Sequence, residues 1–180
     1  MAIKEILKMG NPLLRQEADL VPLEEIKTDN LKYLVEDMRD TLEYSGGIGL
    51  AAPQIGVLKQ LVIIKIPEDS ERYPESEESE EFILFNPVIS YIDKTLQGFW
   101  EGCLSIPGLR GFVERPRKIR VDYKNEDSLE CSIEVEDFQA TVFQHELDHL
   151  FGFLYVDRMK DIQTLVFEEE MQNIYEQKEL

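Results

Sequence analysis

The sequence predicts an α+β protein, in which antiparallel or mixed β-sheets pack around one central helix and further helices flank the sheets at the N-terminal and C-terminal ends. Two observations predict this class. The middle of the chain carries apolar or alternating runs rich in β-branched side chains, which are typical of strands. Segments near both ends, and one segment after the strands, repeat apolar side chains at spacings of three and four, which indicates amphipathic helices. The length of 180 residues suits one domain with a substantial core, so we expect residues 1–180 to form a single domain.

The composition is that of a globular chain, with 43% hydrophobic and 31% charged residues. The net charge of −18 argues against a surface that grips phosphate backbones, so no DNA partner is expected. No stretch approaches the roughly 18 to 20 apolar residues that span a bilayer, and no signal pattern opens the sequence. We therefore expect a cytoplasmic protein with no membrane partner, in which Cys103 and Cys131 stay reduced.

The N-terminal third is expected to hold a strand at residues 3–7 and an amphipathic helix at residues 22–44. The pair Gly46 and Gly47 stops this helix. Residues 47–56 (GIGLAAPQIG) are dense in small side chains, which let a backbone approach a ligand closely. Spacing alone favours a tight turn between helix and strand here.

Strands are expected at residues 60–66 and 81–89, and the pair Asn86-Pro87 predicts a bend or an edge position in the second. Between them, residues 68–81 carry eight acidic side chains and one arginine. This composition indicates a solvated surface loop, to which we assign no role.

Residues 117–123 and 129–135 alternate apolar and polar side chains around a turn, which predicts a hairpin. Cys131 shares side-chain parity with the apolar positions of its strand and is expected to be a core thiol. Residues 155–159 are expected to be short and extended. Asp161 could then cap a C-terminal helix over residues 161–180.

The central helix, expected at residues 136–151 with Gly152 as its stop, carries the pattern H-E-x-x-H. His145 and His149 lie four residues apart on one helical face, so their imidazoles can share one metal ion. Glu146 can serve as the carboxylate base beside that ion. These are the only two histidines in the chain, and apolar residues flank them.

The third ligand is expected from residues 98–108 (GFWEGCLSIPG), which we interpret as a loop between the strands and the hairpin. A Cys103 thiolate together with two imidazoles would leave a fourth tetrahedral position open for water, as a hydrolytic centre needs. A buried free cysteine and a cysteine nucleophile with a histidine base are the competing interpretations. The nucleophile is the weaker one, because both histidines already stand at ligand spacing.

Three segments together resemble the signature motifs of the bacterial peptide deformylases: residues 47–54 (GIGLAAPQ), 101–105 (EGCLS) and 144–149 (QHELDH). They occur in the family's order, and the resemblance runs from about Ile3 to Arg158. It implies a single catalytic domain that removes the N-formyl group from the N-terminal formylmethionine of newly synthesised polypeptides and releases formate.

The resemblance also implies the roles of individual residues. Cys103, His145 and His149 would bind one divalent metal ion, with Fe²⁺ expected physiologically and Zn²⁺, Ni²⁺ or Co²⁺ able to replace it. Glu146 would be the general base and then the general acid for a metal-bound water that attacks the formyl carbonyl. The formyl oxygen would be held by the metal, the Leu104 backbone N–H and the Gln54 side-chain amide. The peptide edge and the methionine pocket would be lined by Gly47, Ile48, Gly49, Phe99, Gly102, Arg110, Phe138, Thr141 and Val142.

The partners implied are N-formylmethionyl nascent peptides, and the protein is expected to be a monomer. Some family members use a basic C-terminal helix to dock near the ribosomal exit tunnel. Here residues 168–180 carry five glutamates and one lysine, so any transient ribosome contact is expected to use another surface.

Two alternatives to the deformylase remain open at this point. A zinc metallopeptidase could use the same helix, although it would leave residues 47–54 and 101–105 unexplained. A non-catalytic metal-binding protein, such as a redox sensor, would need a fourth protein ligand. Asp148 would have to supply it, and Asp148 points away from the histidine face.

Overall fold

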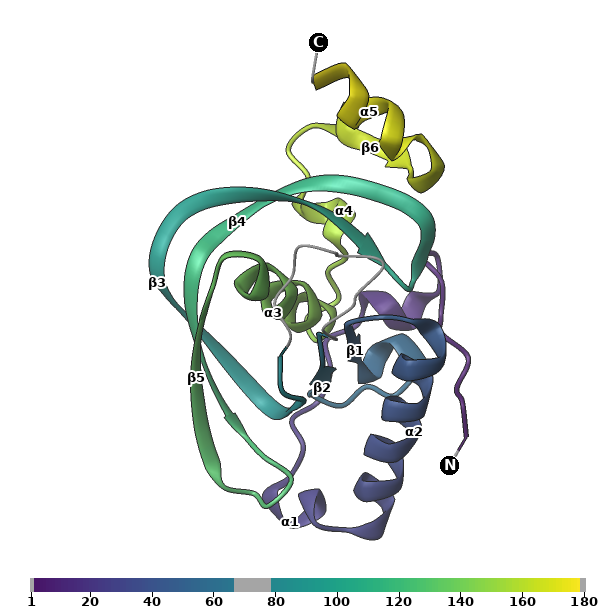
Figure 1. Ribbon diagram of the computed structural model, residues 1–180. Helices are drawn as coiled ribbons and strands as arrows, with labels where there is room; N and C mark the ends of the chain where they lie inside the picture. The colour runs from purple at the N-terminus through teal and green to yellow at the C-terminus, as the bar shows by residue number, and fades with distance from the viewer. Residues whose placement is uncertain (1, 67–78, 179–180) are drawn as a thin grey trace.

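The α+β class is confirmed by the computed structural model of the chain, which describes residues 2–66 and 79–178. The strands of these residues form one sheet in the order β1-β2-β3-β4-β5, with every pair antiparallel and with β6 paired to β4 (Figure 1). The strands are β1 (Gly49–Ala51), β2 (Leu61–Ile64), β3 (Phe82–Cys103), β4 (Ile106–Lys124), β5 (Glu130–Glu136) and β6 (Leu165–Phe167). The α-helices are α1 (Leu23–Ile26), α2 (Asp29–Ser45), α3 (Asp137–His149), α4 (Tyr155–Arg158) and α5 (Met171–Lys178), and 3-10 turns cover Pro12–Arg15, Ala52–Ile55, Ile162–Thr164 and Glu168–Glu170.

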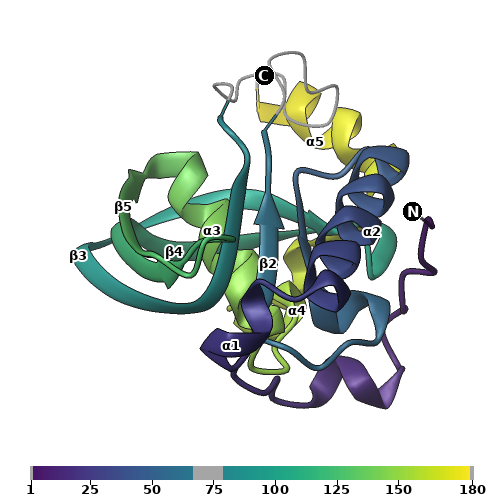
Figure 2. The same ribbon diagram turned by 90° about the horizontal axis from the view of Figure 1, so that it is seen from below.

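Strand β2 is buried on both faces, which explains why its sequence is uniformly apolar. Val62 and Ile64 belong to a core that also contains the apolar side chains of α3. Leu61 and Ile63 point the other way, into a second core with the apolar face of α2. Figure 2 shows the resulting layers, with α2 and α3 on opposite sides of β2.

The long hairpin of β3 and β4 curves around α3, and β5 extends the same wall (Figure 1). The register of the β3–β4 pairing shifts between Phe85 and Val88, and Asn86 takes a positive φ of 51° there. The predicted bend at Asn86-Pro87 is therefore confirmed. The hairpin of β4 and β5 is confirmed as well, with Val121 opposite Ile133. Enclosed in this way, α3 is buried on almost every side, and nine of its residues are inaccessible.

Helix ends follow the predicted glycine signals. Gly46 terminates α2 in the left-handed conformation, and Gly152, at φ 75°, ends the turn that follows α3. The expected helix at residues 22–44 is divided, however, because α1 ends at Ile26 and α2 restarts at Asp29. No helix among the described residues is both long and apolar enough to cross a membrane.

Several expectations for the N-terminal half and the middle of the chain are wrong. Residues 3–7 form no strand: the Lys4 N–H donates to the Thr41 side chain on α2, and the Leu7 N–H donates to the Gln54 carbonyl in a 3-10 turn. Residues 98–108 are not a loop: they are the end of β3, a tight turn at Leu104 and Ser105, and the start of β4. The glycines of this segment suggested a loop, but Gly98 is needed in the sheet, because a Cβ there would lie 2.1 Å from Phe112.

The C-terminal expectations also need correction. Residues 155–159 contain the short helix α4 instead of an extended segment. Residues 161–180 do not form one helix, because Leu165–Phe167 pairs with β4 before α5 begins at Met171. Asp161 does act as a cap, but of a 3-10 turn, where its side chain accepts from the Gln163 N–H. Cys131 is only half-buried, since β5 is an edge strand. Most of the predicted acidic loop at 68–81 lies outside the described residues.

Candidate metal centre

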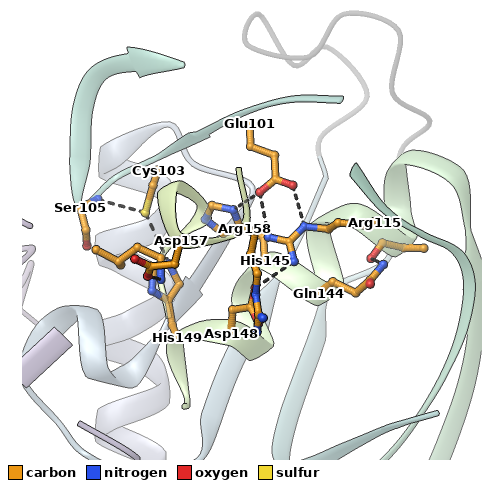
Figure 3. A network of polar contacts seen from close by, with 12 residues as sticks. Glu101, Cys103, Ser105, Arg115, Gln144, His145, Asp148, His149, Asp157 and Arg158 are labelled. Atoms are coloured by element: carbon orange, nitrogen blue, oxygen red, sulfur yellow. Dashed lines mark hydrogen bonds and ion pairs between the residues drawn. The ribbon is translucent and has the colours of Figure 1, made fainter. Parts of the chain in front are cut away.

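Helix α3 and the end of β3 bring together three side chains that could bind one metal ion. His145 and His149 lie one turn apart on α3 with ring centroids 5.2 Å from each other. Cys103, the last residue of β3, places its sulfur 3.4 Å from Nε2 of His149 (Figure 3). One ligand atom from each of the three side chains lies within 4.8 Å of the other two, and all three residues are buried. Among the described residues, no other group of histidine, cysteine or acidic side chains is arranged in this way.

The electrostatics of the cluster favour a cation. Burial alone raises the pKa of the Cys103 thiol, but the nearby imidazoles of His149 and His145 outweigh it and hold that pKa well below its ordinary value. Burial lowers the pKa of His145, yet its contacts with Cys103 and Glu101 raise it well above the usual range. The site therefore concentrates negative charge beside the imidazoles.

The donor set fits one divalent metal ion. A thiolate sulfur and two imidazole nitrogens are ligands for Zn²⁺, Fe²⁺, Co²⁺ and Ni²⁺. Asp148 is not available as a fourth ligand, because it receives hydrogen bonds from Arg115 and Arg158 instead. Three protein ligands leave a coordination position for water or substrate, as catalytic sites require and closed structural sites do not.

A buried chain of alternating charges supports the histidine ligand. His145 donates from Nδ1 to Glu101 at 2.8 Å, and Glu101 receives two further bonds from Arg115 at 2.6 and 3.0 Å. Arg115 also donates to Asp148 at 2.8 Å, and Asp148 accepts from Arg158 (Figure 3). Burial raises the pKa of the Glu101 carboxyl, but Arg115 and His145 more than reverse this effect, so the pKa lies below its ordinary value. The carboxylate fixes the tautomer of His145 and directs its Nε2 toward Cys103.

Glu146 lines the same pocket as Cys103 and His145. Its Oε2 is buried and forms no hydrogen bond with the described residues. Burial raises its pKa, against the opposing influence of His145 and His149. Gly49 leaves room for it, because a Cβ at that position would lie 2.5 Å from Oε1 of Glu146. A buried carboxylate without a partner is suited to accept and return a proton.

Gln54 aims its amide at the sulfur ligand. Its Oε1 accepts from the Ala51 N–H at 2.8 Å, and this bond turns Nε2 toward Cys103 Sγ, 3.6 Å away, and Ser105 Oγ, 3.3 Å away. Leu104 lies in the turn directly after Cys103. The pocket in front of the ligands is lined by Gly47, Ile48, Gly49, Gln54, Gly102, Cys103, Leu104, His145 and Glu146.

The remaining predicted pocket residues lie beyond this lining. Phe99 and Phe138 pack edge to face, with ring centroids 5.5 Å apart, although they come from β3 and α3. Thr141 and Val142 are buried on the turn of α3 before His145. Arg110 lies within the β4–β6 ladder, opposite Val166, and is paired with Glu168.

Sequence reasoning did not assign a role to Arg115, Arg158 or Ser105. Glu101 belongs to the segment 101–105, but its role as the partner of His145 depends on the packing of α3 against β3. Arg115 carries no local signal, because it reaches the site only through the β3–β4 hairpin, where Gln97 is its opposite residue.

The α+β fold, the three ligands and the partnerless glutamate on a H-E-x-x-H helix define a mononuclear metal-dependent hydrolase. The profile of the polypeptide deformylase family matches residues 3–164. The chain belongs to the peptide deformylase family, whose members remove the formyl group from N-formylmethionyl peptides.

Relatives match over nearly the whole chain. A peptide deformylase of Leptospira biflexa is 48% identical over 171 residues, which cover 95% of this chain and 96% of the relative. One from Prochlorococcus marinus is 42% identical over 172 residues, which cover 96% of this chain and 88% of the relative.

Solved structures show the same fold. The class I type b peptide deformylase from Acinetobacter baumannii with Met-Ala-Ser bound has a TM-score of 0.84 at 32% identity, covering 88% of this chain and 99% of that chain. The peptide deformylase from Synechococcus elongatus in complex with actinonin has a TM-score of 0.79 at 34% identity, covering 91% of this chain and 82% of that chain. The chain is thus a metal-dependent hydrolase that acts on the N-formylmethionine end of new polypeptides.

Proposed function

We propose that Glu146 carries the proton in this deformylation, while Cys103, His145 and His149 hold the metal ion. The observation that supports this assignment most strongly is the buried, partnerless Oε2 of Glu146 in the pocket that Cys103 and His145 also line. A divalent ion held there supplies Lewis-acid polarisation of the formyl oxygen and lowers the pKa of a bound water. Glu146 takes the proton of the attacking water and returns it to the leaving amine.

Two donors of the protein would then hold the formyl oxygen: the Gln54 side-chain amide and the Leu104 backbone N–H. Gln54 is oriented before substrate arrives, because its Oε1 is already bonded to the backbone of Ala51. Donors that need no rearrangement stabilise the charge that develops on the oxygen in the tetrahedral transition state.

The peptide would bind as an added strand along residues 47–49. Strand β1 stands at the end of the sheet order, and among the described residues only β2 pairs with it, so its other edge has no partner strand there. The Acinetobacter baumannii enzyme binds Met-Ala-Ser, which supports a peptide ligand for this chain as well. For the methionine side chain we propose the apolar pair Phe99 and Phe138 with Val142 and Thr141, beside Gly102. Arg110, held by Glu168, would border this pocket.

The physiological ion is proposed to be Fe²⁺, which suits one thiolate and two imidazoles, although Zn²⁺, Ni²⁺ and Co²⁺ suit them as well. We further propose that the chain acts as one catalytic domain and as a monomer in the cytoplasm. Any ribosome contact would avoid the C-terminal segment, whose acidic charge repels RNA. Tight, salt-sensitive binding of RNA by that segment would contradict this proposal.

Formate release from a short N-formylmethionyl peptide tests the proposed metal and ligands. Protein purified anaerobically with iron is compared with protein reloaded with zinc, and the unformylated peptide is the control. We expect rapid release with iron, slower release with zinc, and none from Cys103→Ala. Equal rates with both ions would remove the preference for iron, and full activity of Cys103→Ala would remove the thiolate ligand.

A further inference from the structure

The two proposed oxyanion donors stand on separate segments of the chain. Gln54 belongs to the 3-10 turn after β1, and Leu104 belongs to the turn between β3 and β4. Two side-chain contacts link these segments directly, from Gln54 Nε2 to Ser105 Oγ at 3.3 Å and to Cys103 Sγ at 3.6 Å. The contact with Ser105 is long, and both contacts use the amide that must also bind the formyl oxygen. They are therefore weak restraints on the distance between the two donors.

The N-terminal segment Leu7–Met9 links the same two turns through backbone groups that the reaction does not use. The Leu7 N–H donates to the Gln54 carbonyl at 2.8 Å, and the Met9 N–H donates to the Ser105 carbonyl at 2.8 Å. These bonds are shorter than the side-chain links, and they leave the Gln54 amide free. They also explain why the N-terminal residues take no part in the sheet.

Lys8, between these two residues, bonds to the donor segment itself. Its Nζ donates to the Leu104 carbonyl at 2.9 Å. This carbonyl shares a peptide group with the Ser105 N–H, which in turn donates to Cys103 Sγ at 3.4 Å. A cation on the carbonyl fixes the plane of the peptide and strengthens its N–H as a donor to the sulfur.

We propose that residues 7–9 clamp the two oxyanion donors at a fixed separation, and that Lys8 is a positioning residue for the deformylation step. The proposal rests on the roles proposed above for Gln54 and Leu104. Lys8 itself does not touch the substrate: it acts through the peptide group that follows Leu104.

Lys8→Met and Lys8→Arg test this role, with Lys4→Met as the matched control. Lys4 comes from the same exposed N-terminal segment and also has a partner, Asp37 at 2.9 Å, but this contact lies on α2 and away from the pocket. Each protein is loaded with metal, and kcat and KM are measured with N-formyl-Met-Ala-Ser. Because donors to a developing oxyanion act in the transition state, misplacing them lowers kcat and leaves KM nearly unchanged.

We expect kcat to fall about tenfold in Lys8→Met, a fraction of the 10²- to 10³-fold cost of losing a whole oxyanion donor. Lys8→Arg should restore most of the rate, and Lys4→Met should match the parent chain. The Co²⁺-loaded form gives a second measurement, because loss of Lys8 should shift the thiolate-to-metal charge-transfer band through the weakened Ser105 bond. A loss of stability alone would move neither kcat at saturation nor this band.

The proposal is overturned if kcat of Lys8→Met stays within about twofold of Lys4→Met, or if Lys8→Arg does not restore a lower rate. Gln54→Ala separates this failure from failure of the proposed function. If Gln54→Ala loses turnover while Lys8→Met keeps it, Gln54 keeps its proposed role as an oxyanion donor and the proposed positioning role of residues 7–9 is contradicted. If Gln54→Ala keeps full turnover, the oxyanion role of Gln54 and the positioning role of residues 7–9 are both contradicted.

Discussion

His145 donates its Nδ1 hydrogen to the Glu101 carboxylate at 2.8 Å, and both side chains are almost fully buried. The bond joins the helix that carries two of the proposed ligands to the strand that carries the third, because Glu101 precedes Cys103 by two residues on β3. It leaves Nε2 of His145 as the nitrogen for the metal. Arg115 balances the charge of Glu101, so the carboxylate remains ionised although it is buried.

Glu101→Gln is expected to weaken metal binding by about 10- to 100-fold, as loss of an outer partner of a ligating histidine commonly does. The substitution keeps the shape of the side chain but removes the charge that polarises His145. Chelator competition measures the change in affinity. Glu114→Gln is the control, because Glu114 is on the neighbouring strand β4 but is paired with Lys160 at the surface. Unchanged metal affinity in Glu101→Gln would contradict the role of the carboxylate.

Gly49→Ala is expected to lower kcat by about 100-fold or more, because a displacement near 1 Å of a catalytic group can cost that factor. The new Cβ would lie 2.5 Å from Oε1 and 2.6 Å from Cδ of Glu146, so the carboxylate must move. The three heavy atoms nearest to the new Cβ all belong to Glu146 and none to a proposed metal ligand, so metal content should stay at one ion per chain. A variant with normal metal content and normal kcat would show that the position of Glu146 is not critical.

Asp157→Asn is expected to destabilise the fold at neutral pH and to lose this effect in acid. Asp157 accepts hydrogen bonds from Arg15 and from the Leu154 N–H. Burial raises its pKa, but these bonds outweigh it and lower the pKa below the ordinary value of 3.8. A lowered pKa means that the ionised form stabilises the fold above the unfolded-state pKa, and that this stability is lost as pH falls.

Urea unfolding of the parent chain and Asp157→Asn at pH 7 and near pH 3 measures this difference. We expect about 1–2 kcal/mol at pH 7 and a smaller value at pH 3. Asp127→Asn, in the exposed turn between β4 and β5, corrects for the change in net charge. A difference that is equal at both pH values would rule out an ionic origin.

Glu168→Gln is expected to reduce the unfolding free energy by about 1–2 kcal/mol, because it weakens a charged hydrogen bond to the buried Arg110. The Arg110 side chain is 7% exposed, whereas Glu168 is 45% exposed, so the guanidinium depends more on the pair than the carboxylate does. Glu169→Gln, next to it and exposed, is the control. Equal stabilities of the two variants would show that the β4–β6 contact holds Arg110 without this charge.

Features that depend only on residues close together in the sequence could be predicted from the sequence. His145 and His149 share a helical face by their spacing alone, and the structure places them at one site. The hairpin of β4 and β5 likewise follows from alternation around a turn. The glycine-rich segment 98–108 does not form a loop, because Gly98 and Gly102 are strand residues. The missing side chain of Gly98 makes room for Phe112, and Gly102 lines the pocket in front of the proposed ligands.

Residues whose partners lie far away in the sequence could not be predicted from a local pattern. Arg115 reaches Glu101 and Asp148 only after β4 folds back on β3, and Lys8 reaches Leu104 across 96 positions. The C-terminal segment was expected to be a helix from its apolar spacing, but pairing with β4 overrides that preference at Leu165–Phe167.

The most direct test of the account is formate release by Glu146→Gln with its metal content measured on the same sample. Glutamine keeps the size of the side chain and cannot take a proton from water. The account predicts about one divalent ion per chain and a loss of kcat of about 10²- to 10⁴-fold or more. Formate release near the parent rate, with the metal still bound, would contradict it and remove Glu146 from the reaction.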